Sequence, residues 1–323
     1  MRFFVNKDIT SNTNTFYLIL MFNTLSLLFI TTSIIYYNLT YGFSYEKLYT
    51  YFFTDFNFPE KVSIKQVAES VHINLFLNMF LFIMISSVLS VVNFSEKFKI
   101  FIIINQFISL ILYSFSDLII FYLDGLLYLK PFSFLLFTVN SLLILILSTL
   151  KLVKKNLQPS HKTLKLIILF FSVSGLVFIT FNFFIFYNKI GFLPIDVKSY
   201  FLGSEYNYTK PKTLEGLIKV FFPHMLTMVV YTFVIAHFLN FTGLKRSISL
   251  ILSLTILLSA ILDNLSSLMI RYLNENFVYL KLVSFVVFEV SSSIALLYIV
   301  LKVISSFKMD KTLNFRNNLK TFY

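Results

Sequence analysis

The chain has 323 residues, of which 57% are hydrophobic and only 13% are charged. Soluble domains average roughly 45–50% apolar and about 25% charged residues, so this composition excludes an ordinary water-soluble domain. Cysteine is absent, which excludes disulfides, thiolate metal sites and thiol catalysis. The net charge is +12. We attribute this charge to membrane topology and expect no nucleic-acid partner, because no predicted soluble domain carries it.

Apolar runs of about 20 residues recur along the whole chain, and each is long enough to cross a bilayer core of roughly 30 Å as a helix. The predicted spans are, in chain order, residues 15–36, 71–92, 98–123, 132–150, 164–187, 217–240, 247–270 and 278–303. The first run is too long for a signal-peptide core and has a counterpart later in the chain, so we expect it to stay in the protein. The pattern predicts an all-α polytopic membrane protein with eight transmembrane helices and the lipid bilayer as its partner.

The sequence repeats itself at an offset of about 150 residues. Tyr128-Leu129-Lys130 returns 151 residues later as Tyr279-Leu280-Lys281, and Tyr51-Phe52 returns 149 residues later as Tyr200-Phe201. A nearly constant offset across the chain indicates two tandem copies of one structural unit.

Four predicted spans fall in each copy, which we place at residues 1–155 and 156–323. An even number of crossings returns the chain to its starting side of the membrane. The copies are therefore predicted to be parallel four-helix repeats, related by an axis along the membrane normal.

The distribution of Lys and Arg predicts the orientation. With a cytoplasmic N-terminus, that side receives residues 1–14, 93–99, 151–165, 241–247 and the tail after residue 300. These segments hold 16 of the 27 Lys and Arg residues but only three acids. Because cationic loops are retained in the cytoplasm, we expect a cytoplasmic (inner) membrane protein with both termini cytoplasmic.

The first connection in each copy is long, at residues 37–70 and 188–216. Each carries a helix start, with Ser44 as a capping residue in the first copy and Pro194 as a first helical residue in the second. We therefore predict a short helix in each connection, lying in the membrane interface.

Five acidic or histidine side chains within the spans are the candidate site residues, and all five fall in the half of the membrane opposite the termini. They are His72, Asp117, His224, Asp263 and Glu289. An ionisable group at membrane depth costs roughly 2.5–3.5 kcal/mol on insertion scales, so we expect these groups to face the protein interior and form a substrate or proton site.

The repeat does not pair these residues with identical partners. Asp117 aligns with Ser267, whereas Asp263 aligns with Tyr113, one helical turn away. The second copy holds more of these groups, because Glu289 joins His224 and Asp263 there. An exact two-fold pair of identical ligands is therefore not predicted, and the second copy is favoured as the site.

Several interpretations of these residues remain open. They form interhelical hydrogen bonds that hold the bundle together, or they line an outward-opening cavity for a small cationic or proton-coupled solute. A third interpretation is a bis-His haem held by His72 and His224 in an electron carrier; otherwise no cofactor and no metal are expected.

The sequence contains no Gly-rich phosphate loop, no nucleophile elbow and no His-Glu-x-x-His zinc pair. We therefore expect no enzyme. The function predicted is small-solute or proton-coupled transport or binding. The alternative is a non-catalytic anchor or assembly subunit that binds other membrane subunits.

Overall fold

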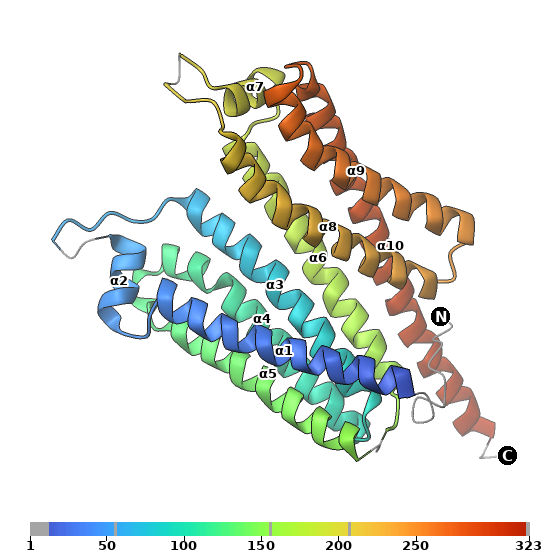
Figure 1. Ribbon diagram of the computed structural model, residues 1–323. Coiled ribbons are helices and arrows are strands. Elements are labelled where there is room, and N and C mark those ends of the chain that lie inside the picture. The colour runs from blue at the N-terminus through green and yellow to red at the C-terminus, as the bar shows by residue number, and fades with distance from the viewer. Residues whose placement is uncertain (1–12, 55–56, 155–156, 206–207, 321–323) are drawn as a thin grey trace. The chain divides into compact units, whose positions relative to one another are not determined.

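The chain is almost entirely helical. The computed structural model describes residues 13–54, 57–154, 157–205 and 208–320 (Figure 1). The elements are α1 (Thr13–Thr40), α2 (Tyr45–Phe53), α3 (Ile64–Val91), α4 (Glu96–Tyr122), the short 3-10 helix η1 (Asp124–Leu126), α5 (Leu129–Val153), α6 (His161–Lys189), α7 (Pro194–Leu202), α8 (Leu214–Phe241), α9 (Arg246–Tyr272) and α10 (Phe277–Lys320). The described residues form no β-strand, only isolated bridges, which confirms the predicted all-α class.

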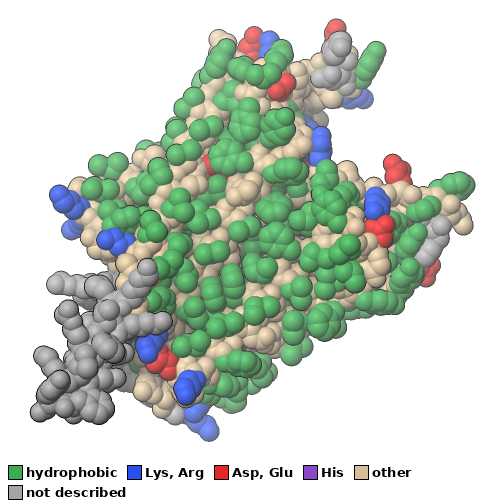
Figure 2. Space-filling model, turned by 180° about the vertical axis from the view of Figure 1, so that it is seen from behind, with side chains coloured by type: hydrophobic (Ala, Val, Ile, Leu, Met, Phe, Trp, Pro, Cys, Tyr) green, Lys and Arg blue, Asp and Glu red, His purple; other side chains and the backbone are tan. Residues whose placement is uncertain are grey.

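The long helices match the predicted membrane spans. Among the described residues, seven helices are long and apolar enough to cross a bilayer, namely α1, α3, α4, α5, α6, α9 and α10. The eighth, α8, has 28 residues, but its described apolar stretch is the shorter Thr227–Phe241. Hydrophobic side chains cover most of the face drawn in Figure 2. The chain is therefore a polytopic α-helical membrane protein that is surrounded by lipid.

The helices form two compact units that divide between Ser174 and Gly175, inside α6. In the first unit, α3 packs on α1, α4 and α5, and α5 also packs on α1 and α4. In the second unit, α9 packs on α8 and α10, and α7 packs on α9 and α10. The domain boundary predicted between residues 155 and 156 concerns the duplicated sequence and stays a prediction.

A glycine ends the first long helix of each unit. The amide of Gly42 donates to the carbonyl of Tyr37, and the amide of Gly191 donates to that of Phe186. Both glycines have positive φ, at 66° and 90°, a conformation that glycine adopts without steric cost. A Cβ added at Gly42 would lie 2.4 Å from the Lys47 side chain. The two turns feed the chain directly into α2 and α7.

The short helices α2 and α7 confirm the predicted helices of the long connections. Ser44 caps α2 by accepting a hydrogen bond from the amide of Lys47 at 3.4 Å. In α7 the first position is Pro194, whose missing amide hydrogen is not needed there. Each unit therefore carries a short helix at the end where its first long helix stops.

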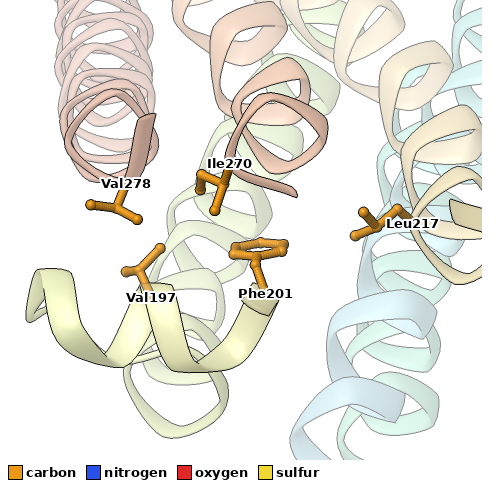
Figure 3. Close-up of a cluster of buried hydrophobic side chains, with 5 residues drawn as sticks. All are labelled: Val197, Phe201, Leu217, Ile270 and Val278. Carbon is orange, nitrogen blue, oxygen red and sulfur yellow. The ribbon is translucent and has the colours of Figure 1, made fainter. Parts of the chain in front are cut away.

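Apolar side chains fasten these short helices to the unit. In the second unit, Val197 and Phe201 on α7 point toward Ile270 on α9 and Val278 on α10 (Figure 3). These residues form a buried cluster that also contains Leu217. The first unit repeats the arrangement about 150 residues earlier with the buried residues Phe52, Phe53, Ile120 and Leu127.

A stacked aromatic pair repeats in the same way. The rings of Tyr37 and Phe134 stack at 4.0 Å in the first unit, and those of Phe186 and Phe285 stack at 3.9 Å in the second. The two units thus share internal contacts as well as helix order, as expected for a duplicated fold.

Candidate functional site

A buried ion pair lies near the α2 end of the first unit. The carboxylate of Asp117 on α4 contacts the amino group of Lys130 on α5, with 2.7 Å between Oδ1 and Nζ. The two side chains are 1% and 0% exposed. Because removal of one partner would leave an uncompensated buried charge, the pair holds α4 and α5 together.

Side chains from three other positions complete the surroundings of this pair. Oδ2 of Asp117 accepts hydrogen bonds from the hydroxyls of Ser70 and Tyr41, the latter at 3.3 Å. The rings of Tyr41 and Tyr113 have their centroids 4.4 Å and 4.5 Å from Nζ of Lys130. Hydrogen bonds thus stabilise the negative charge, and cation–π contacts stabilise the positive one.

A second ion pair occupies the equivalent place in the second unit. Nζ of Lys281 on α10 lies 2.9 Å from Oδ1 of Asp263 on α9, and it donates to the Asp263 backbone carbonyl, also at 2.9 Å. The side chains are 8% and 14% exposed. The lysines align in the repeat, but Asp263 aligns with Tyr113. The acid therefore reaches the same lysine from one helical turn away.

Glu289 has a different environment from either aspartate. It is 1% exposed on α10, and its Oε1 accepts a hydrogen bond from the side-chain amide of Asn182 on α6 at 2.9 Å. No ion pair forms at Glu289 within the described residues, and its Oε2 has no hydrogen-bond partner there. This carboxyl group is therefore buried against a neutral amide and not against a lysine.

The two histidines of the predicted site lie on α3 and α8. His72 is half-buried on α3 in the first unit. His224 is exposed on α8 in the second unit, and its Nδ1 lies 2.9 Å from the carbonyl of Val220. The described residues contain no group of three or more metal-ligating side chains.

The first unit also contains a pocket of about 300 Å³ next to the Asp117 pair. Its wall combines aromatic rings with polar side chains from α1, α2, α3 and α4 and their connections. The lining residues are Tyr36, Tyr41, Tyr51, Phe52, Val62, Gln66, Val67, Glu69, Ser70, Ile73, Asn74 and Asp117. Burial, reinforced by the charge of Asp117, raises the pKa of the Tyr51 hydroxyl, which therefore stays a hydrogen-bond donor.

The site residues predicted from the sequence did not include Lys130 and Lys281. The structure corrects this, because both amino groups are buried in ion pairs. The sequence did contain a sign of these buried lysines, the repeated Tyr-Leu-Lys segment, which lies at the start of α5 and near the start of α10. A lysine kept in both copies at the start of an apolar helix indicates a buried partner.

These features define a helical membrane protein built from one duplicated bundle unit. The family model Aq_1264_TM, described as a transmembrane helical domain, matches residues 42–159 and again residues 191–311. Together the two matches cover well over half of the chain, so the protein belongs to this family and carries its domain twice. Comparison with curated proteins and with solved structures gave no match.

Each match begins at one of the two turn glycines, Gly42 and Gly191. The matched domain therefore comprises a short helix and the three long helices that follow it. It contains both ion pairs in full, whereas α1 and the whole of α6 precede the respective matches.

Proposed function

We propose that this membrane protein binds a small cationic solute in the pocket of the first unit and moves it across the bilayer. The pocket itself carries the proposal. Its volume of about 300 Å³ lies at the lower end of the range of ligand sites, roughly 300–1,000 Å³, which suits a solute of a few heavy atoms.

The charges and rings of the pocket favour a cation. Glu69 and Asp117 are the acids of its lining, and no described base lines it. Lys130 neutralises Asp117 from behind the wall, and Glu69 brings a second carboxylate to the lining. The rings of Tyr36 and Tyr51 present π-faces of the kind that attract ammonium groups.

The proposal includes an orientation, with both termini cytoplasmic as the excess of Lys and Arg predicts. The pocket is lined by Tyr36 at the C-terminal end of α1 and by Tyr41 directly after it, and a single crossing separates that end from the N-terminus. The pocket then opens on the non-cytoplasmic side of an inner membrane, where an incoming solute arrives.

Methylammonium uptake tests the proposal. Full-length protein in proteoliposomes with an inside-negative potential is expected to accumulate labelled methylammonium. The Glu69→Gln variant is expected to lower uptake at least fivefold, because it removes a carboxylate from the lining of the pocket. Glu60→Gln is the control, since Glu60 is exposed in the same connection outside the pocket, and it should leave uptake unchanged.

Equal uptake by Glu69→Gln and wild type, or no uptake above empty liposomes, would overturn the proposal. The alternative is then a non-catalytic anchor or assembly subunit, which predicts that other membrane subunits co-purify with the protein. We propose no enzymatic activity. A Soret absorption band in the purified protein would instead support the third interpretation, a haem held by His72 and His224 in an electron carrier.

A further inference from the structure

We propose that a second pocket, at the opposite end of the first unit, binds a phosphate group such as the head group of an anionic phospholipid. This pocket measures about 280 Å³. Its lining contains Glu96, Lys99, His161 and Lys162 together with the apolar Phe94 and Pro159. It is independent of the proposed solute site, with which it shares no lining residue.

Lys99 supplies a buried cation to this pocket. Its side chain is 1% exposed, and Nζ donates to the backbone carbonyls of Ser90 at 3.0 Å and Gln158 at 2.7 Å. An ammonium group has three hydrogens, so these two acceptors leave one. No ion pair to Lys99 occurs in the described segments of the chain, and an anion in the pocket would balance its charge.

Two helix N-termini add positive potential. Helix α4 begins at Glu96 and α6 begins at His161, and both residues line the pocket. The ends of helix dipoles and their free amides favour phosphate at such a position. They supplement the lysines, which already mark the pocket as an anion site.

The acid in the pocket is only loosely held. Glu96 contacts Lys162 at 3.6 Å between Oε1 and Nζ, and the side chains are 42% and 51% exposed. Exposed pairs of this kind contribute about 0–1 kcal/mol, so a phosphate can take over Lys162. Lys151 lies 5.0 Å from the ring centroid of Phe94 and brings another positive charge to the edge of the pocket.

The position of the pocket favours a lipid as the source of the phosphate. The apolar helices α4 and α6 both start there, so the pocket lies where head groups meet the hydrocarbon core. Basic pockets between helix ends are typical sites for anionic head groups. The described part of the second unit does not repeat the buried lysine, because Lys99 aligns with Ser249, whose hydroxyl donates to Asn240.

Native mass spectrometry of the full-length protein tests the proposal with phosphatidylglycerol as the probe and phosphatidylcholine as the neutral reference. Wild type is expected to retain phosphatidylglycerol in preference. Lys162→Gln should lower that retention about fivefold, the effect of one basic contact. Glu96→Gln should raise it, because the competing carboxylate is gone.

Lys97→Gln is the matched control, because Lys97 is exposed on the same turn of α4 and does not line the pocket. The proposal fails if Lys97→Gln and Lys162→Gln lose lipid equally, or if wild type does not prefer the anionic lipid and also binds no inorganic phosphate. If millimolar inorganic phosphate displaces the lipid from wild type but not from Lys162→Gln, the site is upheld and free phosphate is its source.

Discussion

The two ion pairs stabilise a buried lysine in different surroundings. In the first unit the acid and the lysine are completely buried, and two tyrosine rings enclose the amino group. In the second unit both partners are partly exposed, and the lysine relies on a backbone carbonyl instead of a ring. The lysine position is therefore the fixed element of the repeat, and its surroundings are free to change.

The largest expected effect is at the enclosed pair. Lys130→Met leaves Asp117 as an uncompensated buried charge and should destabilise the protein by about 3–5 kcal/mol. Thermal or denaturant unfolding in detergent measures this loss. Adding Asp117→Asn to Lys130→Met should recover a large part of it, and a double variant no more stable than the single one would contradict the ion-pair account.

A smaller loss is expected at the second pair. Lys281→Met should cost roughly 1–3 kcal/mol, the usual cost of an unsatisfied buried group, because Asp263 keeps partial exposure. The same unfolding measurement compares the two variants directly. If Lys281→Met lowers the free energy of unfolding as much as Lys130→Met does, the deeper burial of the first ion pair does not contribute to stability.

The shift of the acid by one turn can be reversed. Asp263→Asn removes the acid of the second pair, and adding Ser267→Asp places one where Asp117 stands in the first unit. We expect the added acid to restore at least half of the lost stability, since the lysine is flexible. Failure of this rescue would show that only one of the two positions is within reach of Lys281.

The turn glycines Gly42 and Gly191 test whether the same substitution costs the same stability in the two units. Gly42→Ala and Gly191→Ala each force a side chain into a positive φ, at a cost of about 1–2 kcal/mol. Both variants should shift the unfolding midpoint down by similar amounts. Gly243→Ala is a useful comparison, because its φ is also positive but an added Cβ meets no atom within 4 Å.

The smallest effect on stability is expected at Glu289. Glu289→Gln keeps a polar group of the same size opposite Asn182, so stability should change by less than about 1 kcal/mol. If Glu289 takes part in transport, methylammonium uptake falls while the protein still folds. If both uptake and stability are unchanged, Glu289 has no role in transport and contributes only to the packing between helices.

The sequence predicted the helices well because membrane spans depend on composition over about 20 residues, which tolerates local errors. The predicted starts of the short helices at Ser44 and Pro194 were also correct, since capping is a local signal. The partners of Asp117 and Asp263 were not predicted. Each lies on the next helix, and hydropathy placed Lys130 outside the fourth predicted span.

Glu289 shows a further limit of sequence reasoning. Its depth and rarity were readable, but its pairing with Asn182 depends on how α6 and α10 pack within the second unit. The sequence repeat does not indicate that contact, because Asn182 precedes the matched domain. The pocket of the first unit could not be predicted from the sequence either, because four separate segments of the chain form its wall.

A lysine carries four methylene groups, about enough to span the 5.4 Å rise of one helical turn. The side chain of the repeated lysine can therefore reach an acid at either of two positions one helical turn apart. Relatives of this domain need not keep their aspartate in one alignment column. A search that anchors on the lysine and accepts either of two acid positions should recover pairs that column-by-column comparison overlooks.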